Sequence, residues 1–169
     1  MKRIKTQKRR ISMKHMLVNL SFAAVLAAIL PTAYGQTCSL ARAAGTYGFN
    51  DSGTVVGVGP RVATGIFTLD AAGNLLNGKA TSSLNGVIAD EAFSGRYTVN
   101  PDCTGTFALK VFDPSGNFLF TATLNLVWDD NMRELRFIFT SAVLPNGTPL
   151  TIAVNGDGRK VVPPPGDGQ

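Results

Sequence analysis

The sequence contains one histidine and two cysteines among 169 residues, and charged residues make up only 16% of it. The histidine, His15, lies in an N-terminal segment that we expect to be removed. Without it, the chain lacks the base on which Ser-His-Asp and Cys-His catalysis depend and the usual nitrogen ligand of zinc. No glycine-rich loop precedes a predicted helix, so the sequence offers no phosphate-binding loop. We therefore predict no catalytic residues, no metal site and no cofactor.

Residues 1–35 are typical of a signal peptide. Met1–His15 contains seven basic residues and no acidic one, and an apolar run, Leu17–Leu30, follows. Ala33-Tyr34-Gly35 then provides small residues for cleavage before Gln36. The apolar run is shorter than the roughly 20 residues of a membrane-spanning helix. We expect cleavage after Gly35, a secreted or periplasmic protein, and no membrane anchor after cleavage.

Removal of this segment reverses the sign of the net charge. The whole chain has 16 basic and 11 acidic residues, for a formal charge of +5. Without the seven basic residues of the leader, nine remain against eleven acids, for a charge of −2. A negatively charged protein is a poor ligand for the phosphate backbone, so nucleic acid is not an expected partner.

The two cysteines, Cys38 and Cys103, are predicted to form a disulfide bond. Two cysteines in a small exported domain usually pair, because the compartment is oxidising. The bond would close a loop of about 65 residues, which chain-entropy models value at on the order of 4 kcal/mol. A reactive thiol is the alternative, but no histidine would remain to activate it.

Period-two alternation of apolar and polar residues dominates the chain after Gly45 and predicts β-strands. The clearest strand is Asn117–Trp128, and others are Ala92–Val99, Gly105–Phe112 and Arg133–Ser141. Asp70–Asn74 and Asp113–Asn117 resemble tight hairpin loops, each opened by Asp and containing Gly. No segment outside the leader has helical periodicity.

Eight or nine short strands with short links predict an all-β fold, an antiparallel up-and-down β-barrel, with a two-sheet β-sandwich as the alternative. Closure would remove the exposed strand edges that promote aggregation. We expect one barrel domain over residues 36–160. The proline- and glycine-rich residues 161–169 are expected to form a disordered tail. An outer-membrane barrel is disfavoured because the chain does not end in an aromatic strand.

Three motifs resemble a group of exported bacterial proteins of unknown function. The motifs are Cys38-Ser39-Leu40, Gly45-Thr46-Tyr47-Gly48-Phe49 and the run from Gly95 to Thr106, with the pattern GxYTVxxDCTGT. The resemblance implies a small barrel of the lipocalin or allene-oxide-cyclase kind. Tyr47 occupies the position where lipocalins have the tryptophan of a Gly-x-Trp motif, so the lipocalin ligand residues do not transfer.

Aromatic side chains on the apolar faces are expected to share the barrel interior. In a small barrel, such side chains either fill the lumen or line a ligand cavity. For the cavity we predict Tyr47 and Tyr97 as polar anchors and Phe67, Phe120 and Trp128 as walls. The full set expected inside is Tyr47, Phe49, Phe67, Phe93, Tyr97, Phe107, Phe118, Phe120, Phe137 and Phe139.

The carboxylate pairs Asp90-Glu91 and Asp129-Asp130 offer little for catalysis. Neighbours in a strand point to opposite faces, and carboxylates in turns are usually solvated. The same turn interpretation is preferred over calcium binding at Asp129–Asn131 and Asn155–Gly158, because no twelve-residue calcium loop is present.

These observations favour a non-catalytic exported barrel that acts as a binding or cell-envelope interaction module. Its expected partner is a small apolar ligand or a component of the cell envelope. One alternative is a barrel enzyme of the cyclase or isomerase type, with Tyr47, Tyr97 or a buried Arg96 or Arg136 steering the substrate. A second alternative is an extracellular structural or adhesive protein that uses its outer face.

Overall fold

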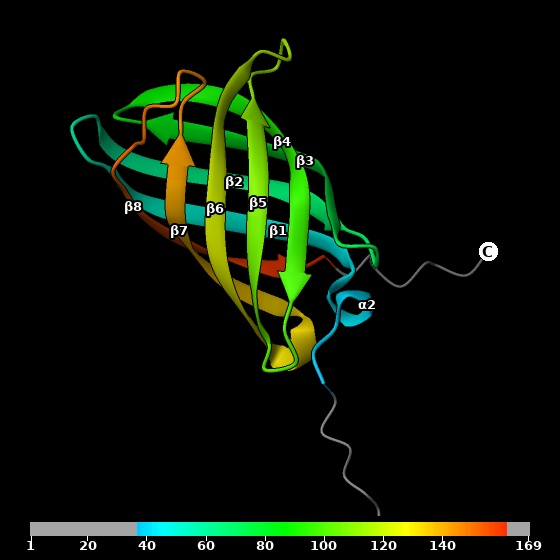
Figure 1. Cartoon of the computed structure of the whole chain (residues 1–169). Coiled ribbons are helices and arrows are strands. Elements are labelled where there is room, and N and C mark those ends of the chain that lie inside the picture. The colour runs from blue at the N-terminus through cyan, green and yellow to red at the C-terminus, as the bar shows by residue number, and fades with distance from the viewer. Residues whose placement is uncertain (1–36, 162–169) are drawn as a thin grey trace, which may run out of the picture. The chain divides into compact units, whose positions relative to one another are not determined.

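The computed structural model describes residues 37–161, which form a closed antiparallel β-barrel with strands in sequential order (Figure 1). A one-turn helix precedes the barrel, and a 3-10 turn joins its sixth and seventh strands. In chain order the elements are α2 (Leu40–Ala43), β1 (Gly45–Val55), β2 (Gly59–Leu69), β3 (Asn74–Leu84), β4 (Val87–Val99), β5 (Thr104–Phe112), β6 (Phe118–Asp129), η2 (Asp130–Met132), β7 (Glu134–Val143) and β8 (Ile152–Lys160).

Pairing of β1 with β8 closes the barrel. The register runs from Tyr47 opposite Lys160 to Val55 opposite Ile152. Every strand therefore has a hydrogen-bonded neighbour on both sides, and no strand edge is left open. The predicted up-and-down barrel is confirmed with eight strands, and the sandwich alternative is wrong. The expected leader and all but the first residue of the expected tail lie outside the described residues.

Hairpin loops form where the sequence predicted them. The Asp70 carboxylate accepts hydrogen bonds from the backbone N–H groups of Ala72 and Asn74, at 2.9 and 2.8 Å. Asp113 similarly accepts a bond from the Asn117 N–H at 2.8 Å. Hydrogen bonds from the Asn74 and Asn117 side-chain amides, together with these backbone bonds, lower the pKa of both aspartates.

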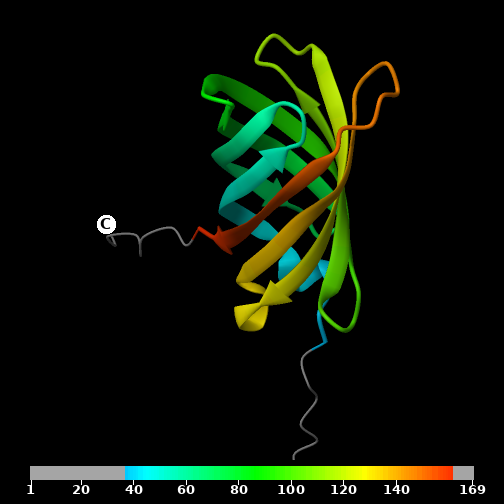
Figure 2. The same ribbon diagram turned by 90° about the vertical axis from the view of Figure 1, so that its left-hand side faces the viewer.

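One end of the barrel is closed by the segment before β1. Figure 2 shows this segment at the end of the barrel that also carries the β4–β5 turn. A disulfide between Cys38 and Cys103 ties the segment to that turn, which confirms the predicted pairing. Helix α2, which sequence periodicity did not reveal, is capped by the Ser39 side chain and buries Ala43. Within residues 37–161, no helix combines the length and apolar character needed to span a bilayer.

The inward faces of the strands form one apolar core. Tyr47, Leu69, Leu75 and Leu135 are almost completely buried in it. Gly105 also faces inward, and a Cβ there would lie 2.7 Å from the Trp128 ring, so only glycine lets the indole cover the strand. The apolar faces of the predicted strands are therefore the core, as alternation indicated.

Phe118 is an exception, because we expected it in the interior and its exposed fraction is 38%. The register between β5 and β6 shifts near the hairpin, so that Val111 pairs with Phe120 and Phe112 with Phe118. This bulge moves Phe118 out of phase with Phe120, and its ring packs against Phe112 instead, 5.9 Å between centroids.

Removal of the disulfide should destabilise the barrel, because the bond closes a loop between residues 65 positions apart. We expect the double variant Cys38→Ala/Cys103→Ala to lose about 2–4 kcal/mol of unfolding free energy in urea titrations. Adding a reductant should lower the stability of the wild type to that of the variant and leave the variant unchanged. Equal stability of oxidised and reduced wild type would contradict a stabilising role.

Candidate functional site

A buried cluster of charged side chains lies inside the barrel, in the half away from the disulfide. Arg61 of β2 donates two hydrogen bonds to the Glu91 carboxylate of β4, Nη1 to Oε1 at 2.9 Å and Nη2 to Oε2 at 3.0 Å. Ser82, on the strand between them, donates to Glu91 Oε1 at 2.8 Å. Both side chains of the ion pair are 10% exposed, so this is a bidentate pair in a largely dry environment.

Asp51 of β1 completes the cluster and has the fewest hydrogen-bond partners of its members. Its carboxylate lies 3.4 Å from Arg61 Nε, which is an ion-pair distance without hydrogen-bond alignment. Asp51 is 4% exposed, and its Oδ1 atom has no hydrogen-bond partner among the described residues. Burial raises the pKa of Asp51, an effect that the nearby Arg61 only partly offsets and that Glu91 reinforces. With both acids ionised, the cluster carries a net charge of −1.

A small cavity lies beside this cluster in the barrel lumen. Its volume is about 40 Å³, which is room for a few water-sized groups. Asp51, Arg61 and Glu91 form its polar side, and the rest of the lining is apolar, mostly phenylalanine. The aromatic rings thus fill most of the mid-barrel lumen, and the charged side chains border the space that remains.

A larger hollow of about 580 Å³ opens at the mouth of the barrel. It shares Arg61, Glu91, Phe120 and Phe139 with the inner cavity, so the two spaces adjoin at the charged cluster. Its walls are mainly aliphatic and come from the strand ends and the β7–β8 loop. They include Val55, Leu84, Val87, Ala89, Leu119, Ala142, Leu144, Leu150 and Ile152. This volume falls in the range of small-molecule sites. The polar residues of the lining are Asn85 and, next to the inner cavity, Arg61, Ser82 and Glu91.

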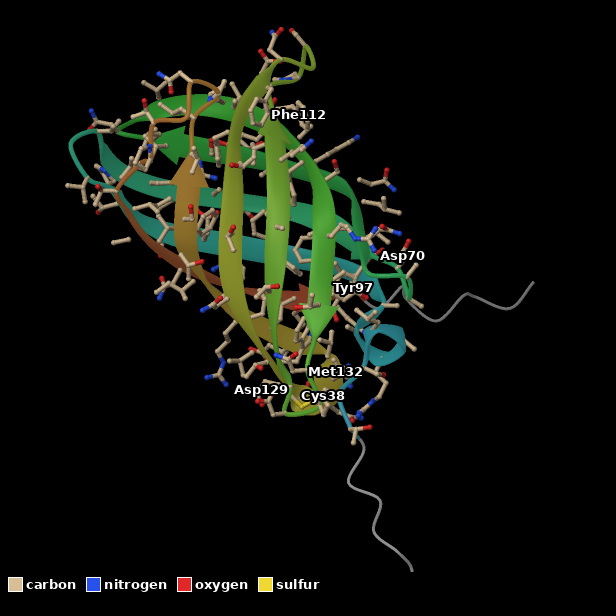
Figure 3. The ribbon with its side chains drawn as sticks, viewed as in Figure 1. Cys38, Asp70, Tyr97, Phe112, Asp129 and Met132 are labelled. Carbon is tan, nitrogen blue, oxygen red and sulfur yellow. A yellow bond between two sulfur atoms is a disulfide. The ribbon has the colours of Figure 1, made fainter. Side chains whose placement is uncertain are left out.

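The five predicted ligand residues divide between the two ends of the barrel. Phe67 and Phe120 line the inner cavity, and Phe120 also borders the mouth. Tyr47, Tyr97 and Trp128 belong instead to the closed end, where Figure 3 places Tyr97 on the side of Cys38 and Met132, far from Phe112. None of these three residues lines either space.

The hydroxyls of both tyrosines bind backbone carbonyls at the closed end. The Tyr47 hydroxyl donates to the Ala43 carbonyl at 2.8 Å. The Tyr97 hydroxyl lies 3.1 Å from the Leu40 carbonyl and 2.6 Å from the Asp70 carbonyl. Burial raises the pKa of Tyr47 and raises that of Tyr97 to about 12, so both donate as neutral phenols. Trp128 packs beside Tyr97, with 6.3 Å between ring centroids. This geometry fastens the segment before β1 to the barrel.

Arg96 and Arg136, one of which the enzyme alternative required to be buried, are both exposed, and the buried arginine among residues 37–161 is Arg61. The sequence did contain a signal for the cluster. Asp51 continues the alternation of Tyr47 and Phe49, and Glu91 is in phase with Phe93, so each had to face inward.

The adjacent acids behave as alternation predicts. Glu91 points into the lumen, whereas Asp90 lies on the outer face and accepts a hydrogen bond from Thr81 at 2.7 Å. Asp129 contacts Arg136 outside the barrel. Among residues 37–161, no group of three or more His, Cys, Asp or Glu side chains is arranged to hold a metal ion.

Comparisons with known proteins give a likeness in fold alone. No family model and no curated protein matches the sequence. A structure of EF1p2_mFAP2b bound to DFHBI is 14% identical, covers 73% of this chain and 100% of its own, and has a TM-score of 0.50. A redesigned beta barrel, mFAP1, also bound to DFHBI, is 16% identical over 72% of this chain and 98% of its own, with a TM-score of 0.47.

Breaking the buried ion pair should cost far more stability than removing its neighbour. Glu91→Gln leaves Arg61 without its bidentate carboxylate, and we expect a loss of about 3–5 kcal/mol in urea unfolding. Asp90→Asn removes a carboxylate one position away on the outer face, and we expect a change of about 0.5 kcal/mol or less. Equal losses in the two variants would show that the ion pair inside the barrel stabilises the protein no more than an exposed carboxylate does.

Asp51 should make the folded state less stable as pH rises. Because its folded-state pKa is raised, the folded protein holds this proton more tightly than the unfolded chain does. Its contribution is therefore favourable below the unfolded pKa, near 4, and is lost as pH rises through the higher folded pKa. We expect the unfolding free energy of the wild type, relative to Asp51→Asn, to fall over that window. Asp90→Asn controls for loss of one acid, and a difference that rises with pH would contradict the assignment.

Proposed function

We propose that this protein is an exported, non-catalytic binding barrel that holds a small ligand with an apolar body at its open end. The observation that supports this most directly is the 580 Å³ hollow, walled by aliphatic side chains and floored by Arg61, Ser82 and Glu91. Sites for small molecules usually have this composition, in which apolar walls provide affinity and a few polar groups fix orientation.

The division of the barrel into two ends supports the same proposal. The disulfide, α2 and the two tyrosines close one end, so a ligand would enter and leave through the other. The disulfide is also compatible with an oxidising compartment, secreted or periplasmic. A barrel of similar fold, EF1p2_mFAP2b, is bound to the small ligand DFHBI, which supports a small molecule as the partner.

Phe67 and Phe120 remain in the proposed site, whereas the polar anchors change. Because the hydroxyls of Tyr47 and Tyr97 are engaged at the closed end, we assign the anchoring role to the charged cluster. A component of the cell envelope that inserts an apolar group into the mouth would meet the same surface.

A cyclase or isomerase is the second candidate, and Asp51 is the observation that favours it. A buried carboxyl group with a raised pKa beside an apolar cavity is suited to proton transfer. Arg61 would then replace Arg96 and Arg136 as the cation near the substrate.

Binding of a neutral fluorescent probe, N-phenyl-1-naphthylamine, tests the proposal. Its emission rises when it enters an apolar site, and we expect saturable binding by the wild type. Ala89→Trp places an indole in the mouth, which Ala89 lines, and should weaken binding at least tenfold. Ala108→Trp makes the same change at an exposed position on the outer face of β5 and should leave binding within about twofold.

Either of two results would overturn the proposal. The first is the absence of binding by the wild type, and the second is equal binding by the Ala89→Trp and Ala108→Trp variants. Circular dichroism and thermal unfolding of both variants would show that each retains the barrel.

A further inference from the structure

We infer that the lumenal site selects ligands with a positively charged hydrogen-bond donor, such as an ammonium group, attached to an apolar body. This inference rests on the proposed function, because it assigns the chemistry of the ligand that the open end would hold. Three observations support it: an Asp51 oxygen that accepts no hydrogen bond, the composition of the charged cluster, and the small cavity and larger hollow that adjoin at this cluster.

Asp51 Oδ1 is an acceptor without a donor. The Asp51 side chain lines the inner cavity. Arg61 Nε lies 3.4 Å from Oδ1 without the alignment of a hydrogen bond, and no other group among residues 37–161 donates one to this oxygen. A buried acceptor without a partner is costly, and a ligand that donates an N–H or O–H group would remove that cost. A ligand carboxylate offers only acceptors and would leave Asp51 unsatisfied.

The charge of the cluster favours a cation. Arg61 directs both terminal nitrogens to Glu91 and its Nε toward Asp51, so its charge is shared between two carboxylates. The neighbouring strands add no further charge, because Gly156 of β8 and Ala63 of β2 lie opposite Asp51. With both carboxylates ionised, one negative charge is in excess in a low-dielectric lumen, where it attracts a cation and repels an anion. The raised pKa of Asp51 reflects the same uncompensated burial.

The two spaces match the two parts of such a ligand. The inner cavity, at about 40 Å³, holds a group of the size of a few waters and includes Asp51 in its wall. The mouth, at about 580 Å³, holds a drug-sized apolar body but does not include Asp51. An ammonium group in the cavity and its apolar substituent in the mouth would occupy both spaces, with Arg61, Glu91, Phe120 and Phe139 around the junction.

Three ligands of one shape test the inference by calorimetric titration at neutral pH. They are 1-naphthylmethylamine, 1-naphthalenemethanol and 1-naphthoate, which present a cation, a neutral donor and an anion on the same rings. We expect the amine to bind at least tenfold more tightly than the alcohol, and the carboxylate to bind most weakly.

Asp51→Asn is the decisive variant because it keeps the shape of the side chain and removes the excess charge. It should lower affinity for the amine at least tenfold, abolish the preference for amine over alcohol, and leave alcohol binding within about twofold. Asp90→Asn, on the outer face of β4, should preserve the full preference. Thermal unfolding confirms that both variants are folded.

The outcomes separate this inference from the proposed function. If the alcohol binds, is blocked by Ala89→Trp, and is bound as tightly as the amine, the barrel binds apolar ligands and the head-group inference is wrong. Tighter binding of 1-naphthoate than of 1-naphthylmethylamine would also overturn the inference, and it would indicate that Arg61 binds the head group of the ligand. If none of the three ligands binds and the neutral probe also fails, the proposed function itself is wrong.

Discussion

Pairing of β1 with β8 is the constraint on which the rest of this structure depends. Once these strands join, each strand has one face toward a closed interior and one toward the outside. Successive side chains of a strand then point alternately into the lumen and to the outside, so that Glu91 lies inside and Asp90 outside. A charged residue in phase with the apolar face is withdrawn from the outer solvent and needs partners within the barrel. The cluster of Asp51, Arg61 and Glu91 follows from this requirement.

Closure also gives the lumen two unlike ends. At one end, the Cys38–Cys103 disulfide and the hydroxyls of Tyr47 and Tyr97 fasten the short segment that contains α2 against the strands. At the other end, aliphatic side chains leave a hollow above the charged cluster. Among the described residues, each end has one buried side-chain polar atom without a hydrogen bond, Trp128 Nε1 at the closed end and Asp51 Oδ1 beside the inner cavity. Asp51 lines the cavity that adjoins the hollow at the mouth, and this is the reason that we place the proposed ligand at the open end and give its head group to Asp51.

Particular residues show how far the pattern of the sequence reaches. Alternation in Asn117–Trp128 correctly predicted that Leu124, Leu126 and Trp128 face inward, and it failed for Phe118, because a bulge shifts the register near the hairpin. The pairing of Cys38 with Cys103 was predictable from number and compartment. The same alternation already placed Asp51 and Glu91 inside. Charged side chains are usually on the surface, so alternation alone does not single them out as a site.

The sequence by itself determined the class of fold, the inward and outward faces of the strands, and the disulfide, because these depend on local periodicity and on residue chemistry. The tertiary structure decided which inward residues meet. Tyr47, Phe49 and Asp51 alternate along one strand, yet Tyr47 packs into the closed end, whereas Asp51 meets Arg61 and the inner cavity. That division depends on strand register and barrel tilt, which set the level of each side chain along the lumen through pairing between segments distant in the chain. No single strand contains this information.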